Sequence, residues 1–109
     1  MKNVTLDLTT YRTEGARVFT GRDRGKLVRD KSLIDELEKN YDQIKILIPE
    51  DIYSINPSFL EEFLFNVVSK LGKDGFYKKF EFSNAGEYEI EEDLESAIER
   101  ILRKSNALL

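Results

Sequence analysis

Three residue types are missing from this sequence of 109 residues: cysteine, histidine and tryptophan. Without cysteine the chain has no disulfides, no thiolate metal ligands and no cysteine nucleophile. Without histidine it has no zinc site of the usual ligand sets, no Ser-His-Asp triad and no histidine phosphotransfer. We therefore expect no metal and no other cofactor, and we expect that the protein is not an enzyme.

Long apolar runs are also missing. No run approaches the roughly 18 apolar residues that span a bilayer. The first residues lead directly into alternating polar and apolar positions, without the apolar segment of a signal peptide. We expect a cytoplasmic protein with no membrane partner. The length fits one domain over residues 1–109, with enough chain to bury a single hydrophobic core.

Basic residues are in the minority, with 17 against 21 acidic ones, a net charge of −4 and a pI near 5.0. This balance argues against nucleic acid as a partner. The charge is unevenly distributed, because residues 1–31 carry eight Lys/Arg and four Asp/Glu, whereas residues 32–109 carry nine and 17. We interpret the basic N-terminal part as a solvated face.

Strand patterns occur at four places in the sequence. Residues 4–8 alternate apolar and polar side chains, and residues 17–20 form a β-prone segment that could pair back as a hairpin. Residues 44–48 are almost continuously apolar, which predicts a central strand covered on both faces. Residues 79–82 alternate again, which predicts a further short strand.

Helix patterns fill the intervals between these strands. A first helix is predicted from about residue 23 to residue 39, and a last one from the apolar stripe over residues 94–102. A middle helix begins with Asn56 as N-cap and Pro57 at its first position, and Gly72 is the glycine after its C-cap. This order predicts the α/β class: a mixed sheet of about four strands, the later ones parallel, packed by three helices.

A stretch rich in glycine and arginine lies where the second predicted strand passes into the first helix. Free N–H groups at a helix N-terminus, together with arginine side chains, form an anion site. The spacing of residues 21–25 is neither that of a P-loop nor that of a dinucleotide-binding fingerprint. The competing interpretation is a turn with Asp23 as the N-cap and the arginines solvated or ion-paired. The candidate anion-binding residues are Gly21, Arg22, Arg24, Gly25 and Arg29.

The second candidate site is the junction between the central strand region and the middle helix. In open α/β sheets the edge at which strands pass into helices usually carries function. Ser58 is predicted near solvent in the first helical turn, and the sequence offers no obvious base to make it a nucleophile. The competing interpretation is a well-capped helix. The candidate partner-binding residues are Ser54, Asn56, Pro57 and Ser58.

The pattern Gly21-Arg22-x-x-Gly25-x-x-x-Arg29, the hydrophobic strand after it and the segment 55–60 resemble the bacterial STAS-like family of unknown function. That family is a distant relative of the STAS domains of anti-sigma-factor antagonists. The resemblance implies a STAS-like fold and a regulatory module that binds a protein partner, either a histidine-kinase-like ATPase or an anti-sigma-type regulator. The alternative left open is a phosphate- or nucleotide-binding domain that uses the loop from Gly21 to Arg29.

This chain differs from the STAS antagonists at the phosphorylation site. In STAS antagonists the loop before the corresponding helix carries a phosphorylatable serine, preceded by aspartate and followed by a second serine. Aligned on the helix start, Asn56 falls at the aspartate, Pro57 at the phosphoacceptor and Ser58 at the second serine. The acceptor hydroxyl is therefore missing from its own position, and the phosphorylation switch is not carried over to this chain.

Overall fold

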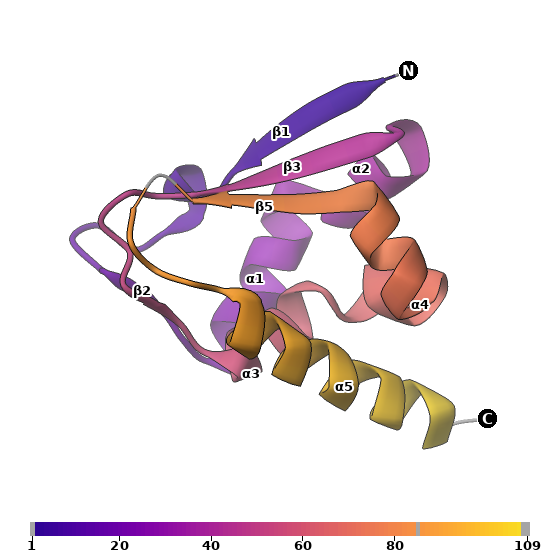
Figure 1. Cartoon of the computed structure of the whole chain (residues 1–109). Coiled ribbons are helices and arrows are strands. Elements are labelled where there is room, and N and C mark those ends of the chain that lie inside the picture. Colours follow the sequence, from indigo (N-terminus) through magenta and orange to yellow (C-terminus); the bar gives the residue numbers. More distant parts are fainter. Residues whose placement is uncertain (1, 85, 108–109) are drawn as a thin grey trace.

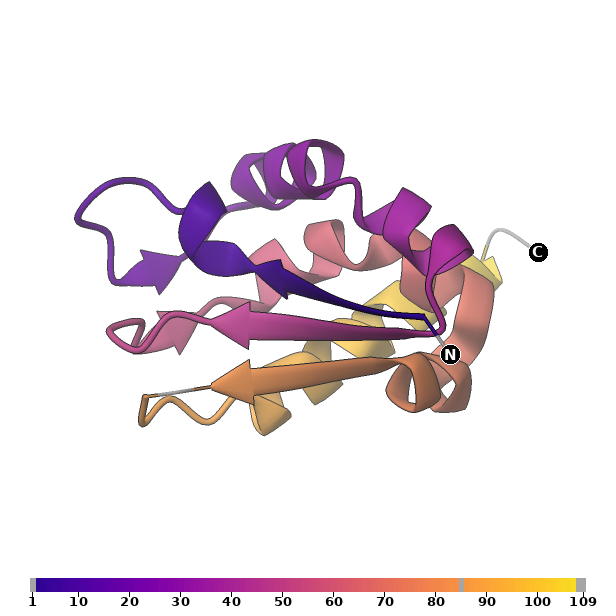
Figure 2. The ribbon, with the colours of Figure 1, turned by 90° about the horizontal axis from the view of Figure 1, so that it is seen from above.

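The computed structural model describes residues 2–84 and 86–107 and shows a parallel three-stranded sheet with helices packed against it (Figure 1). Its strands are β1 (Asn3–Asp7), β3 (Gln43–Ile48) and β5 (Phe80–Asn84). β3 lies between the other two (Figure 2), in a register that places Ile46 beside Leu6 on one side and Phe82 on the other. The predicted central strand is therefore confirmed.

Two further strands form a separate small sheet. β2 (Val18–Phe19) pairs in parallel with β4 (Ser54–Ile55). The pairing extends by one bond on each side: the Tyr53 N–H donates to the Arg17 carbonyl at 3.0 Å, and the Asn56 N–H donates to the Phe19 carbonyl at 2.8 Å. The single mixed sheet of about four strands is not confirmed, because the described strands pair in parallel throughout and in two sheets.

The predicted hairpin between the first two strands is wrong, and the segment after β1 shows why. The chain leaves β1 in a 3₁₀ turn, η1 (Leu8–Tyr11), whose N-cap Asp7 accepts a hydrogen bond from the Thr9 N–H at 2.9 Å. Leu8 is fully buried in this turn. The chain is thereby anchored in a direction that carries residues 17–20 to β4 instead of back to β1.

Five α-helices accompany the strands in residues 2–84 and 86–107. They are α1 (Arg22–Ser32), α2 (Ile34–Asn40), α3 (Pro57–Phe63), α4 (Phe65–Lys79) and α5 (Glu91–Ala107). The predicted first helix is in fact two helices, because Leu33 adopts a left-handed φ of 57° between them. The predicted middle helix is also divided, at Leu64, and Gly72 has the positive φ of 74° expected after a C-cap. A further helical segment after Gly72, up to Lys79, was not predicted.

The sheet is covered on one face only, which corrects the expectation for β3. Ile44, Ile46 and Ile48 are buried, whereas Gln43 and Lys45, which point to the opposite face, are exposed. In Figure 2 the strands lie in front of α3 and α5, which are seen beyond the sheet. Beneath the sheet, the ring of Phe59 lies 5.0 Å from that of Phe19 and 5.8 Å from that of Phe63, measured between centroids.

Candidate functional site

The two junctions between short strands and helices lie side by side, because β2 and β4 are paired and each passes directly into a helix. At the second junction the Asn56 side chain accepts the Ser58 N–H at 2.8 Å, and the Ser58 hydroxyl donates to the same oxygen at 2.6 Å. Pro57 occupies the first helical position and Ser54 is half-buried in β4. The predicted cap is confirmed, and the four candidate partner-binding residues form one continuous, well-capped segment.

At the first junction, glycine is required at positions 21 and 25 for different structural reasons. Gly21 is the N-cap of α1 with a φ of 94°, so the predicted N-cap role of Asp23 is wrong; Asp23 lies in the first turn instead. Gly25 is buried where α1 crosses α3. A Cβ placed on it would lie 2.5 Å from the Phe59 carbonyl oxygen and 2.9 Å from the Glu62 Cβ. Close helix packing therefore accounts for Gly25 without a bound anion.

The three candidate anion-binding arginines each have a partner within the chain. The guanidinium of Arg22 lies 2.7 Å from a carboxylate oxygen of Glu61. Arg24 donates to the Tyr11 carbonyl at 2.8 Å, and Arg29 donates to a main-chain carbonyl of α3 at 2.7 Å. The competing interpretation of solvated or ion-paired arginines fits Arg22, which is exposed and ion-paired, whereas Arg24 and Arg29 are half-buried against main-chain carbonyls. They tie α1 to η1 and α3, and they do not converge on one point.

Glu61 of α3, the ion-pair partner of Arg22, is buried, and no sequence pattern indicated its role. Its side chain is 1% exposed, and it also pairs with Lys104 of α5, while Arg100 lies 4.0 Å away. Burial is the largest single effect and raises its pKa, but the hydrogen bonds from Arg22 and Lys104 together lower the pKa below the ordinary value of a glutamate. Glu61 thus holds α1, α3 and α5 together.

A second buried carboxylate, Glu38 on α2, repeats this arrangement. Its oxygens lie 2.6 Å from the Lys70 ammonium and 2.9 Å from that of Lys79, and its side chain is 6% exposed. Burial again raises the pKa most, and the two lysines together outweigh that effect and lower it. Sequence offered no signal for either glutamate beyond an acidic residue inside an apolar helical face.

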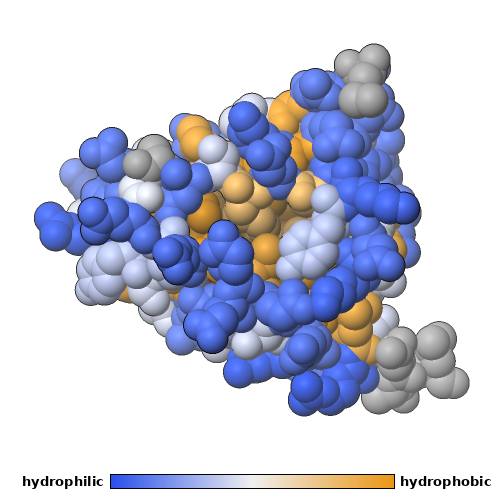
Figure 3. All heavy atoms as spheres, in the orientation of Figure 1, coloured by the Kyte–Doolittle hydropathy of each residue, from blue (hydrophilic) through white to orange (hydrophobic). Residues whose placement is uncertain are grey.

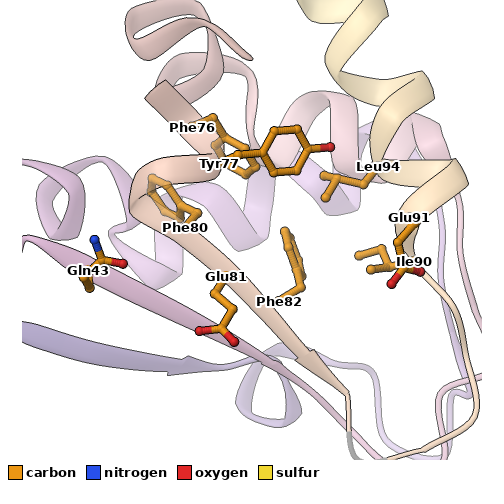
Figure 4. A pocket seen from close by; sticks show the side chains of 9 residues that line it. All are labelled: Gln43, Phe76, Tyr77, Phe80, Glu81, Phe82, Ile90, Glu91 and Leu94. Atoms are coloured by element: carbon orange, nitrogen blue, oxygen red, sulfur yellow. The ribbon is translucent and has the colours of Figure 1, made fainter. Parts of the chain in front are cut away.

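A groove with an aromatic and aliphatic lining lies beside β5. It encloses about 420 Å³. Its lining comes from the end of α4, from β5, from the start of α5 and from one residue of β3 (Figure 4): Gln43, Phe76, Tyr77, Phe80, Glu81, Phe82, Ile90, Glu91 and Leu94. Figure 3 shows hydrophobic residues in a hollow on this face, surrounded by hydrophilic ones.

Tyr77 spans this groove from α4 toward α5. Its side chain extends toward Leu94 in Figure 4, and its hydroxyl donates to the Glu95 carboxylate at 3.0 Å. Lys73, one turn earlier on α4, forms an ion pair with the same carboxylate. Partial burial, followed by the bond to Glu95, raises the pKa of Tyr77 to about 12. Tyr77 therefore presents a neutral phenol, hydrogen-bonded to Glu95, at the wall of the groove.

Two other kinds of site were sought in the described part of the chain. Residues 2–84 and 86–107 contain no cluster of three metal-ligating side chains, and none of their helices is long and apolar enough to cross a membrane. Comparison with models of protein families, with curated proteins and with solved structures gives no significant match.

Proposed function

We propose that this chain is a non-enzymatic protein-interaction module. The observation that supports this function best is the apolar groove beside β5. It leaves Tyr77 43% exposed next to an edge of β5 that pairs with no other strand among the described residues. Exposed apolar hollows with a polar rim are typical of surfaces that bind proteins. An extended polypeptide is the occupant that such an edge accepts, because a strand edge offers main-chain hydrogen bonds.

The distribution of charged groups supports binding over catalysis. A catalytic acid or base is expected in a cleft, with a pKa shifted toward its working pH. Glu38 and Glu61 have displaced pKa values, but both lie inside the fold against lysine or arginine. Their arrangement serves to hold helices together.

The resemblance to STAS-like domains supports a regulatory role for this binding, in the cytoplasm, on an ATPase or an anti-sigma-type partner. The junction with Asn56 and Ser58 is the second surface available to such a partner, next to Tyr53, which is 68% exposed. The phosphate-binding alternative is less well supported, because Arg22, Arg24 and Arg29 are occupied by partners within the chain.

Site-specific photo-crosslinking tests the proposal. A photoreactive amino acid is placed at Tyr77 in the groove, at Tyr53 near the junction or at the exposed Lys39 as a control, and each variant is irradiated in a lysate of the native host. We expect one recurrent polypeptide adduct from position 77, none from position 39, and competition by excess unlabelled protein. Parallel titrations with nucleotides and inorganic phosphate are expected to show no saturable binding. Saturable nucleotide binding without a polypeptide adduct at 77 or 53 would contradict the function.

A further inference from the structure

β5 is an edge strand whose outer side is open. In the described part of the chain β3 pairs with one side of β5, and no strand pairs with the other. Alternate residues of such a strand direct their N–H and C=O groups outward, where they can pair with another chain. Proline, bulges and lysines commonly protect edges of this kind. The five residues of β5 include no proline and no lysine, and their one charged residue is Glu81.

The surroundings of this edge differ on its two faces. On the covered face lies the groove, with Phe82, Leu94 and Tyr77 around it. On the open face, Glu81 lies beside Lys45 of β3 and is exposed. Side chains of an added strand alternate between the two faces. One set would contact apolar groove residues and the other would lie next to Glu81.

The groove lining also carries charge, which restricts the side chains of an added strand on each face. The charged residues in its lining are Glu81 and Glu91, both carboxylates. Neither has an ion pair within 4.0 Å among the described side chains. Opposite charges on neighbouring strands stabilise pairing and like charges oppose it. Lysine or arginine therefore fits beside Glu81, whose neighbour on its other side is Lys45 of β3, and Glu91 favours the same charge at the groove end of the edge.

We propose that the open edge of β5 binds an extended segment of a partner protein in which apolar residues alternate with lysine or arginine, and adds it to the sheet as a fourth strand. This inference rests on the proposed function and specifies its partner. The main-chain bonds supply affinity, and the groove and the carboxylates select the side chains.

Fluorescence anisotropy with synthetic peptides tests the inference. The probe is Lys-Val-Lys-Ile-Lys-Val-Lys, and the comparison peptide replaces each lysine by glutamate. We expect saturable binding of the lysine peptide and affinity for the glutamate peptide weaker by about tenfold or more, because lysine is attracted to Glu81 and Glu91 and glutamate is repelled by them. A lysine peptide with alternate backbone nitrogens methylated, so that it cannot pair, is expected not to bind.

Charge reversal on the protein is the matched control. Glu81→Lys is expected to bind the glutamate peptide more tightly than the lysine peptide. Glu14→Lys, in an exposed turn, is expected to keep the wild-type preference for the lysine peptide. Thermal melts establish that both variants fold. Equal affinity for the two peptides, binding of the methylated peptide, or a wild-type dimer joined through β5 would each overturn the inference. If no peptide binds while polypeptide adducts still form at position 77, the strand proposal fails and the proposed function stands; absence of any polypeptide adduct overturns the function itself.

Discussion

Gly25 of α1 and Phe59 of α3 approach so closely that a Cβ on the glycine would lie 2.5 Å from the carbonyl oxygen of Phe59. Real Cβ atoms do not come this near to backbone, so Gly25→Ala must separate the two helices. We expect the free energy of unfolding to fall by about 1–3 kcal/mol, as for other overpacked sites. Urea denaturation measures the change. Lys26→Ala, exposed on the same helix, is the control and is expected to leave stability nearly unchanged.

The dependence of the free energy of unfolding on pH should show the contribution of the ionised, buried Glu61. Its pKa is lowered in the folded state from an ordinary value of 4.5, so its ionised form stabilises the fold above pH 4.5, and this contribution is lost as the pH falls through the lowered pKa. Glu61→Gln removes that contribution and leaves Arg22 and Lys104 without their anion, at a cost of about 1–3 kcal/mol near pH 7.

Urea midpoints measured for wild type and Glu61→Gln between neutral and acid pH check this. We expect the two curves to converge as the pH falls. The control is Glu36→Gln, which removes an exposed ion pair with Lys39. Its urea midpoints are expected to follow those of wild type at every pH. A constant difference between wild type and Glu61→Gln at every pH would show that Glu61 is not ionised in the fold.

The cap at the start of α3 gives a separate prediction. Asn56 accepts the Ser58 N–H at 2.8 Å, and loss of such a cap costs about 1 kcal/mol. Asn56→Ala should therefore lower the midpoint of a thermal melt, and Asn56→Ser should restore most of the loss because serine caps as well as asparagine does. If Asn56→Ala melts at the wild-type temperature, the side-chain cap contributes nothing measurable.

The phenol of Tyr77 should ionise at a higher pH than an ordinary tyrosine. Its pKa is raised from 10.0 to about 12, first by burial and then by the bond to Glu95, so the folded state keeps the phenol neutral. The difference in ultraviolet absorbance between wild type and Tyr77→Phe should show phenolate formation near pH 12. In Glu95→Gln the midpoint should move down toward 10, because the carboxylate no longer opposes the phenolate. A difference titration centred near pH 10 in wild type would place Tyr77 in solvent, away from the groove.

Local signals predicted the elements that depend on a few neighbouring residues. The cap at Asn56 and Pro57, the central strand and the final helix follow from capping chemistry and from apolar periodicity. The pairing of β2 with β4 could not be predicted in this way. Each of these strands has two residues, and their partners are separated by more than thirty positions in the sequence.

Other features depend on tertiary contacts that periodicity does not encode. Leu33 adopts a left-handed φ without the glycine that usually marks one, so the break between α1 and α2 had no sequence signal. Gln43 and Lys45 are exposed because helices cover only one face of the sheet. A nearly continuous apolar run does not reveal whether one face of a sheet is covered or both. The partners of Arg22 and the lining of the groove come from distant segments.

Amide hydrogen exchange with and without the lysine–valine peptide tests the central claim most directly, because it reports which strand edge is covered. The account predicts slower exchange in β5, residues Phe80–Asn84, and in the peptide itself, with no change in β1, the other edge of the sheet. Protection of β1 instead, or binding with unchanged exchange in β5, would contradict it.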